Sequence, residues 1–400
     1  MQVLNAIVQT YVSEPSRVED FAIEMQKNLE DKHYESIEND PHVSFKELES
    51  WIAKWKGSFD LMNGGYNYVP KFPLPTHLEF MLHYGASCKD SALLEHAHNT
   101  LSLMGNGGIF DHIEGGFSRY STDAIWKVPH FEKMLYDNAQ LMSLYSLGER
   151  HGTGAHEPGF YRSIVFQIRE WLNATLKTDF GSFRCAQDAD SEGSEGGYYC
   201  WTENELKVLL NNDFSWFKDL YGIRAAEVWE NELFILQKKD TFLNFGKTQG
   251  WSESETLKKV SKVRSILAAT RQKRVKPVVD TKSLTAWNAL LIKGLCDAYL
   301  AFGTTEFLAE ACDLADWLCV NQYNQGGFLY RSNVAGKPDI DAFLDDYALT
   351  IQALVSIYQL AGSLRYIMLA KELCETVHKE FYSEQQKWCF YTKKDSELIA

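Results

Sequence analysis

Apolar residues recur at helical spacing along most of the chain. Two amphipathic helices are predicted at 16–37 and 44–56, and the second follows Ser44 with Glu47 three residues later, which is a capping box. The same pattern predicts further helices at 75–86, 90–103, 131–148, 159–177, 203–212, 255–271, 285–301, 305–322, 345–361 and 364–381. We therefore expect an all-α protein.

A glycine-aromatic turn recurs between these helices. Its copies are Gly64-Gly65-Tyr66, Gly115-Gly116-Phe117, Gly181-Ser182-Phe183, Gly326-Gly327-Phe328 and a degenerate copy at Trp388-Cys389-Phe390-Tyr391. Because glycine tolerates positive φ, we expect it to end the preceding helix at the C-cap, with the aromatic ring packed beneath the rim of a cavity. The chain therefore contains an internal repeat.

The helices of the repeat alternate in character. Those before the turn are striped with charge, whereas those after it are apolar nearly all round and open with Asp137-Asn138-Ala139, Trp287-Asn288-Ala289 and Asp346-Tyr347-Ala348. Outer and inner helices that alternate in antiparallel hairpins close into an (α/α) toroid. We expect an N-terminal helical segment at 1–60 and a toroid domain at 61–400, with an insertion at about 180–284 that contains short strands.

Charge and composition narrow the classes of ligand. The net charge of −14 disfavours a nucleic-acid or anionic-membrane surface, and the basic run 271–276 is read as a solvated loop. The 11 Trp, 20 Tyr and 23 Phe fit either a large core or a ring-lined sugar pocket. The start of the chain is not typical of a signal peptide, and none of the apolar stretches is long enough to span a membrane. The eight cysteines lack CxxC spacing, so a reducing, cytoplasmic setting is expected.

The densest polar and aromatic stretch runs from 111 to 138 and leads into the predicted inner helix. Its candidate residues are His112, Arg119, Tyr120, His130, Glu132, Tyr136 and Asp137. An acid near the start of a helix is also favoured by the helix dipole, so each acid taken alone has a structural explanation as good as a functional one.

Three further stretches offer candidates at the same cavity. Asp188 and Asp190 lie in an acidic loop that resembles the opening of a calcium-binding loop, but Tyr199 stands where the final Glu should be, so no metal is predicted. Trp287 and Asn288 suit a stacking platform beside an amide, although a buried Trp is an equal alternative. In the last stretch, one acid of the Asp345-Asp346 pair caps the helix before Tyr347 while the other faces inward.

Together these side chains predict sugar chemistry, without a cofactor. Two separated carboxylates beside aromatic platforms suit glycoside hydrolysis, whereas the pair His112 and His130 suits epimerisation or isomerisation of a sugar. A non-catalytic toroid that binds a sugar or a protein partner is the alternative. The expected partner is a carbohydrate-type small molecule, with neither nucleic acid nor membrane, and the oligomeric state stays open.

The run GGFSRYSTDAIWKVPHFEKMLYDNAQL resembles the signature of the YyaL-like, spermatogenesis-associated-protein type of thioredoxin-domain-containing proteins. The segments NGGYNYVPKFPLPTHLEFML, AQDADSEGSEGGYYCWT, LTAWNALLIKGL and LDDYALTIQAL resemble other motifs of that family in order, so the similarity covers roughly the whole chain. The resemblance implies a thioredoxin-like domain followed by a six-hairpin glycosidase-like (α/α)6 region, related in fold to sugar epimerases and unsaturated glucuronyl hydrolases. It implies a fold more firmly than a reaction.

The chain departs from the family pattern in four ways. Its first residues correspond to the segment after the thioredoxin-like domain, and four inner helices are predicted where the family implies six. Glu114 stands where the family usually has Gly, and Thr281 where a second Asp usually follows Asp280. We therefore expect an incomplete toroid, in which a catalytic partner could belong to a missing hairpin.

Overall fold

The computed structural model describes residues 2–33, 44–152, 157–324 and 326–393, and these fall into two compact units. The first unit, residues 1–54, contains α1 (Gln2–Ser13), α2 (Pro15–His33) and most of α3 (Phe45–Lys56). The predicted capping box is confirmed, since the Glu47 amide donates to Ser44 Oγ at 3.2 Å and the Ser44 amide donates to Glu47 Oε2 at 2.8 Å. Residues 34–37 of the predicted helix 16–37 lie outside the described residues.

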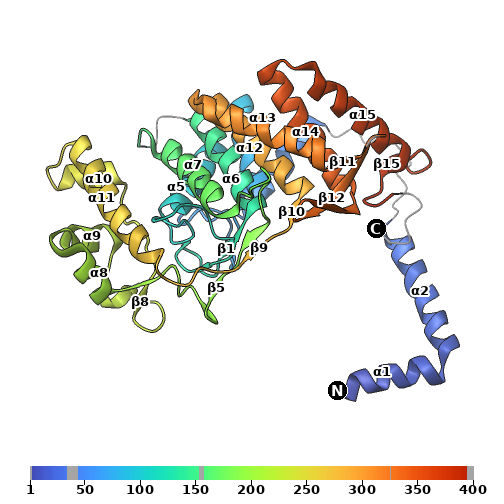
Figure 1. The fold of residues 1–400 in the computed structure, drawn as a ribbon, viewed down its shortest axis with the longest axis horizontal. Helices are drawn as coiled ribbons and strands as arrows, with labels where there is room; N and C mark the ends of the chain where they lie inside the picture. The colour runs from blue at the N-terminus through green and yellow to red at the C-terminus, as the bar shows by residue number, and fades with distance from the viewer. Residues whose placement is uncertain (1, 34–43, 153–156, 325, 394–400) are drawn as a thin grey trace. The chain divides into compact units, whose positions relative to one another are not determined.

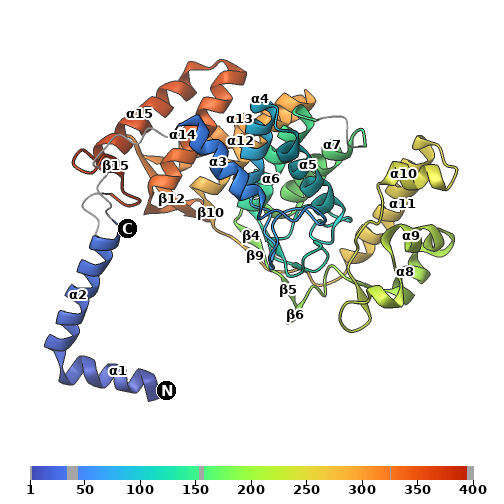
Figure 2. The same ribbon diagram turned by 180° about the vertical axis from the view of Figure 1, so that it is seen from behind.

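The second unit, residues 55–400, consists mainly of helical hairpins (Figure 1). The inner helices are α4 (Pro75–Cys88), α6 (Leu135–Arg150), α12 (Thr285–Phe302) and α14 (Leu344–Ala361). The outer helices are α5 (Ser91–Asn106), α7 (Phe160–Trp171), α13 (Thr305–Asn321) and α15 (Leu364–Glu380). Within the described residues, α12 packs against both α6 and α14, and α4 packs against α5 and α6 (Figure 2). The predicted alternation of inner and outer helices is therefore confirmed.

The inner helices are buried on several sides, as their sequences predicted. Leu135, Leu141 and Met142 of α6 are fully buried, and Ile292 and Ala298 of α12 are equally enclosed. One boundary differs from the prediction, because α6 begins at Leu135 and not at 131. The two preceding residues, Lys133 and Met134, pair with Gln187 and Ala186, so the chain enters the helix from a short sheet.

Each copy of the turn lies beside a tight antiparallel pairing, whose partners are six or seven positions apart in sequence. Within the described chain the paired residues are Phe59 with Tyr66, Phe110 with Phe117, Lys177 with Phe183, Tyr323 with Leu329 and Tyr382 with Cys389. The last pair confirms the degenerate copy near the end of the chain.

The turn glycines have positive φ, but they lie in the loops beyond the helix ends. The prediction that they form C-caps is therefore wrong: α13 ends at Asn321 with Gln322 as its C-cap, whereas Gly326 and Gly327 follow later with φ of 117° and 86°. At Gly116, with φ of 80°, an added Cβ would lie 2.8 Å from the Trp171 ring. The turn therefore requires glycine both for its backbone conformation and for close packing.

An asparagine or tyrosine at the fourth position of three inner helices holds this turn. Asn138 Oδ1 accepts from the Phe117 amide at 2.7 Å and its Nδ2 donates to the Phe117 carbonyl at 2.9 Å. Asn288 makes the same two bonds with Phe183, at 2.9 and 3.0 Å. In α14 the hydroxyl of Tyr347 accepts from the Leu329 amide at 3.1 Å. The repeat is therefore visible both in the sequence and in the hydrogen bonds that hold three of the turns.

Short strands join the helix starts to one another. They are β1 (Tyr120–Ser121), β2 (Pro129–His130), β3 (Lys133–Met134), β4 (Ala186–Gln187), β9 (Val279–Asp280) and β10 (Ser283–Leu284). β1 pairs with β2, and β4 lies between β3 and β9, with all pairs antiparallel. Near the last hairpin, β12 (Phe328–Val334) pairs with β10, β11 (Tyr323–Asn324) and β13 (Lys337–Asp341), and β14 (Tyr382–Ser383) pairs with β15 (Trp388–Cys389). The β12–β13 hairpin was not predicted.

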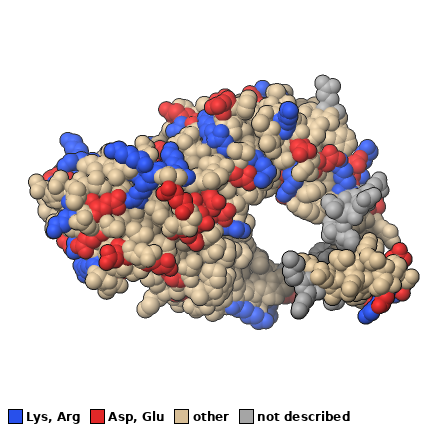
Figure 3. Space-filling view, turned by 60° about the horizontal axis from the view of Figure 1, so that its bottom comes forward, with Lys and Arg blue, Asp and Glu red and all other residues tan. Residues whose placement is uncertain are grey.

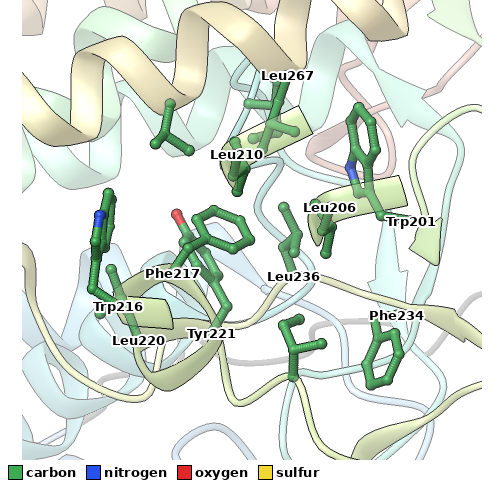
Figure 4. Packing of buried hydrophobic residues seen from close by; sticks show 13 residues of the cluster. Trp201, Leu206, Leu210, Trp216, Phe217, Leu220, Tyr221, Phe234, Leu236 and Leu267 are labelled. Atoms are coloured by element: carbon green, nitrogen blue, oxygen red, sulfur yellow. The ribbon is translucent and has the colours of Figure 1, made fainter. Parts of the chain in front are cut away.

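The insertion carries its own helices and core. It contains β5 (Asp190–Ser191), β6 (Ser194–Glu195), β7 (Trp201–Thr202), α8 (Glu203–Leu210), α9 (Phe214–Tyr221), β8 (Leu233–Phe234), α10 (Phe242–Thr248) and α11 (Glu253–Arg271). Figure 4 shows its buried cluster, in which Trp201, Leu206, Phe217 and Leu267 pack together. The predicted short strands near 197–201 and 234–236 are confirmed in part, since only Trp201–Thr202 and Leu233–Phe234 pair.

A buried charge cluster fastens this insertion to the hairpins. Arg271 donates from Nη1 to both oxygens of Asp111 at 2.8 Å, and Lys133 Nζ contacts Asp111 at 2.9 Å. Arg274 donates from Nη1 to the carbonyls of Tyr198 and Cys200, at 2.9 and 2.7 Å. The prediction that the basic run is a solvated loop is therefore wrong for Arg271 and Arg274. Arg271 neutralises the buried Asp111 carboxylate, and Arg274 donates hydrogen bonds to backbone carbonyls.

The surface carries charged side chains of both signs. Acidic and basic side chains are interspersed over the face shown in Figure 3. Among the described residues, none of the helices combines the length and apolar character needed to cross a membrane.

Candidate active site

The best candidate site surrounds the N-terminal ends of α6 and α12. The β1–β2 pairing sets Tyr120 opposite His130, and β3 runs directly into α6, so His130, Glu132, Tyr136 and Asp137 follow one another along this entry. Backbone pairing of β3 with β4 brings the acidic loop to the same edge. Several sequence-predicted residues therefore come from one sheet-to-helix junction and from the start of α12 beside it. They are Arg119, Tyr120, His130, Glu132, Tyr136, Asp137 and Trp287.

Asp137 is the most unusual side chain of this group. It is 6% exposed, and its Oδ2 is buried without a hydrogen-bond partner among the described residues. Burial raises the pKa of Asp137 to about 7, although the charge of Arg119 acts to lower it. A carboxyl group that stays partly protonated near neutral pH can act as a general acid.

Polar partners next to Asp137 form a connected chain. Arg119 Nε donates to the Tyr136 hydroxyl at 3.2 Å, and its Nη1 lies 3.5 Å from Glu132 Oε2. The Arg119 amide also donates to the Glu132 carbonyl at 2.9 Å. Arg119 is thus oriented by two groups other than Asp137, and the Tyr136 hydroxyl that it contacts also acts to lower the pKa of Asp137.

Aromatic rings line the same junction. The Tyr136 and Trp287 rings lie 4.8 Å apart at 57°, which joins α6 to α12. Tyr120 stacks on His130 at 5.0 Å and contacts Phe72 at 4.9 Å. Partly exposed rings of this kind can stack on the apolar faces of a sugar.

His130 lies between two carboxylates. Its Nδ1 is 2.8 Å from Glu195 Oε1, and its Nε2 is 3.6 Å from Glu132 Oε2. The hairpin of β5 and β6 delivers Glu195, which the sequence analysis did not single out. Its only signal was its place in the acidic loop, because a contact across 65 residues cannot be read from local spacing.

Asp346 occupies the corresponding place in α14 but is saturated with hydrogen bonds. Its Oδ1 accepts from the Ala286 amide at 3.0 Å, and its Oδ2 accepts from the Phe343 amide at 3.0 Å and from Arg331 Nη1 at 2.9 Å. Burial raises the pKa of Asp346 to about 6 despite these donors. Its carboxylate therefore caps α14 and links it to α12.

The other predicted residues lie in different surroundings. Asp188 and Asp190 are exposed, and the Asp190 amide bonds to Asp188 Oδ1 at 3.3 Å within the loop. His112 is buried, and its Nε2 lies 2.9 Å from the Gly107 carbonyl. Burial lowers its pKa to about 3, so it stays neutral, and its contacts differ entirely from those of His130.

Asn288 and Tyr347 hold the turns described above, and both are fully buried. Their side-chain polar atoms bond to backbone groups at Phe183 and Leu329. Among the described residues, none of the groups of His, Cys, Asp and Glu is close enough to hold a metal ion.

Comparison with known proteins places the chain in context. No protein-family model matches it. An uncharacterised protein of Caenorhabditis elegans is 31% identical over 386 residues, which cover 87% of this chain and 52% of that protein. Spermatogenesis-associated protein 20 of Homo sapiens is 30% identical over 370 residues, which cover 82% of this chain and 46% of that protein. The chain thus spans about half the length of the curated relatives it matches.

A solved structure of a UGL variant with dGlcA-Glc-Rha-Glc has a TM-score of 0.51 at 12% identity, and the match covers 86% of this chain and 70% of that one. At this identity the likeness concerns the fold alone. The chain is therefore a homologue of the spermatogenesis-associated protein 20 proteins, and its helical hairpins have the six-hairpin glycosidase-like, (α/α) toroid-type fold.

Proposed function

We propose that this protein is a carbohydrate-active enzyme that cleaves a glycosidic bond, with Asp137 as the general acid. The observation that carries the proposal is the buried Asp137 carboxyl, unpartnered at Oδ2 and with a pKa of about 7, at the start of an inner helix. A protonated acid of this kind can donate its proton to the leaving oxygen of a glycoside.

The neighbouring groups supply the other requirements of that reaction. Tyr136 and Trp287 offer aromatic faces for a sugar ring, and Arg119 offers donors for its hydroxyl groups. Glu132 is a second carboxylate, close enough to Asp137 to influence its pKa, and it is the candidate for activating water.

A second candidate reaction is epimerisation at a sugar carbon. The contact of His130 Nδ1 with Glu195 supports it, because a carboxylate on one ring nitrogen orients the other nitrogen as a base. Hydrolysis is the stronger proposal, since the buried acid is explained by it directly.

The test compares the parent chain with Asp137→Asn on a panel of oligosaccharides, with products followed by NMR. We expect new reducing ends from the parent and a loss of rate of about a hundredfold or more in the variant. Asp179→Asn, at an exposed turn acid, is the matched control and should retain full activity. New reducing ends formed equally by both variants would exclude Asp137 as the acid, and an epimer without cleavage would support the second candidate.

A further inference from the structure

One well-formed cavity lies away from Asp137, between α7 and α11. Its volume is about 460 Å³, within the range of small-molecule sites. Its walls come from the outer helix α7, the insertion helix α11, the loop at 110–114 and the segment that contains Lys238. None of the side chains grouped around Asp137 lines it.

Lys238 is the exceptional residue of this cavity. It is only 7% exposed, and its backbone amide is fixed by a 2.8 Å bond to the Asn106 carbonyl. Its ammonium lies 4.4 Å from the centre of the Phe242 ring and 5.2 Å from that of Phe160. Among the described residues, this ammonium has no hydrogen-bond or ion-pair partner. A buried cation without a direct ion pair is costly even when carboxylates lie at longer range, and an anion bound at Nζ would relieve that cost.

The other charged and titratable groups of the cavity are already engaged or neutral. Arg264 donates from Nε to the Ile113 carbonyl at 2.6 Å and from Nη2 to Glu170 at 3.0 Å. His112 is neutral, and its Nε2 faces the Gly107 carbonyl, which leaves its Nδ1 as an acceptor. Burial lowers the pKa of Lys238 to about 8, while Glu157 and Asp240 act to raise it, so the ammonium is mostly charged at neutral pH.

The rest of the wall is mixed, with an apolar part beside polar side chains of α7 and α11. The apolar part consists of Phe110, Ile164, Phe242, Val260 and Ala268, and the polar residues come from both helices. One unpaired cation suits one negative charge, and apolar walls suit an apolar body of modest size.

We propose that this cavity is a second ligand site, which binds a small organic carboxylate with an apolar body through an ion pair with Lys238. The apolar part of the ligand packs between α7 and α11. The site is independent of the reaction proposed at Asp137, and ligand binding there links the insertion to the outer helix.

The test uses 2-naphthoate as the probe and isothermal titration calorimetry of the full chain. We expect Lys238→Met to weaken 2-naphthoate binding by about tenfold or more, because the charge is lost while the apolar stem remains. Lys238→Gln is the second variant, in case the methionine disturbs folding. Lys239→Met is the matched control, since that neighbouring lysine is 41% exposed and pairs with Glu227.

Two further measurements separate the contribution of the ion pair with Lys238 from that of the fit of the ring in the cavity. The neutral analogue 2-naphthamide should bind the parent chain and Lys238→Met equally. Ala174→Trp places a large ring at an exposed position of the cavity wall and should weaken both probes. The proposal is overturned if the parent chain does not bind 2-naphthoate, or if the Lys238 variants bind it as tightly as the parent. Oligosaccharide turnover is measured in parallel and should be unchanged in Lys238→Met, so failure at one site is distinguishable from failure at the other.

Discussion

Asp137 and Asp346 are the third residues of α6 and α14, and both are buried at the start of an inner helix. Their surroundings differ in the arginine of the preceding turn and in the two backbone amides, of Ala286 and Phe343, that bond only to Asp346. Arg119 and Arg331 each follow the paired turn residue by two positions, but Arg331 contacts Asp346 whereas Arg119 turns to Tyr136 and Glu132. The repeat fixes where the carboxyl lies, and one arginine together with two backbone amides saturates Asp346 while Asp137 Oδ2 stays without a partner among the described residues.

The largest expected effect is the loss of stability on replacement of Asp346, whose carboxylate is saturated with hydrogen bonds. Asp346→Ala removes the acceptor of the Ala286 and Phe343 amides and the counter-ion of Arg331. We expect the free energy of unfolding to fall by about 3 kcal/mol, measured by urea denaturation. A loss below about 1 kcal/mol would mean that the bonds of Asp346 are not structural, and the contrast with Asp137 would fail.

An intermediate effect is expected from Asp137→Asn on stability as a function of pH. The carboxyl releases its proton near its usual pKa of 3.8 in the unfolded chain but near 7 in the native chain. Between these values the native state holds a proton that the unfolded state has lost, so the parent chain loses stability as the pH rises through this window.

Asparagine does not titrate, so the variant lacks this loss. Relative to the parent, Asp137→Asn should gain about 2 kcal/mol of unfolding free energy between about pH 4 and about pH 8, roughly half of what the full shift would give. Urea denaturation at several pH values measures it. Parallel pH profiles for the two proteins would contradict an elevated pKa at Asp137.

The smallest effect concerns the residue at the same place in α12. Trp287→Leu keeps an apolar side chain but removes the aromatic face beside Tyr136. We expect saccharide binding to weaken by about 1 kcal/mol, measured by calorimetry, with unfolding changed less than in Asp346→Ala. If binding stays at the parent level, Trp287 is a packing residue and the site is centred elsewhere on α6.

Much of the fold could be predicted because the helices are long and periodic. The inner helices 285–301 and 345–361 were predicted within one residue of α12 and α14. The β12–β13 hairpin was missed because its second strand, Lys337–Asp341, is exposed throughout and shows no apolar alternation. The start of α6 was misplaced because residues 133–134 pair with β4, about 50 residues away in sequence.

The candidate site was only partly predictable. The sequence marked Asp137 and Asp346 alike, since both follow a turn and begin an apolar helix. Their different hydrogen bonds depend on the directions of Arg119 and Arg331 and on the backbone amides of Ala286 and Phe343, all of which are set by tertiary packing. The buried role of Arg271 was missed for the same reason, because its partner Asp111 lies 160 residues earlier.

The paired bonds of Asn138 and Asn288 also explain how the hairpin ring tolerates unequal connections. Asn138 reaches back 21 residues to Phe117, whereas Asn288 reaches back 105 residues to Phe183, with nearly the whole insertion lying between. Chain-closure entropy grows only with the logarithm of loop length, so the longer connection costs about 1.4 kcal/mol more than the shorter one. Two amide hydrogen bonds offset a cost of that size. A hairpin held by these two bonds can therefore accept an insertion of about a hundred residues without a change in the position of its turn. The insertion also supplies α11, which forms one wall of the cavity that contains Lys238.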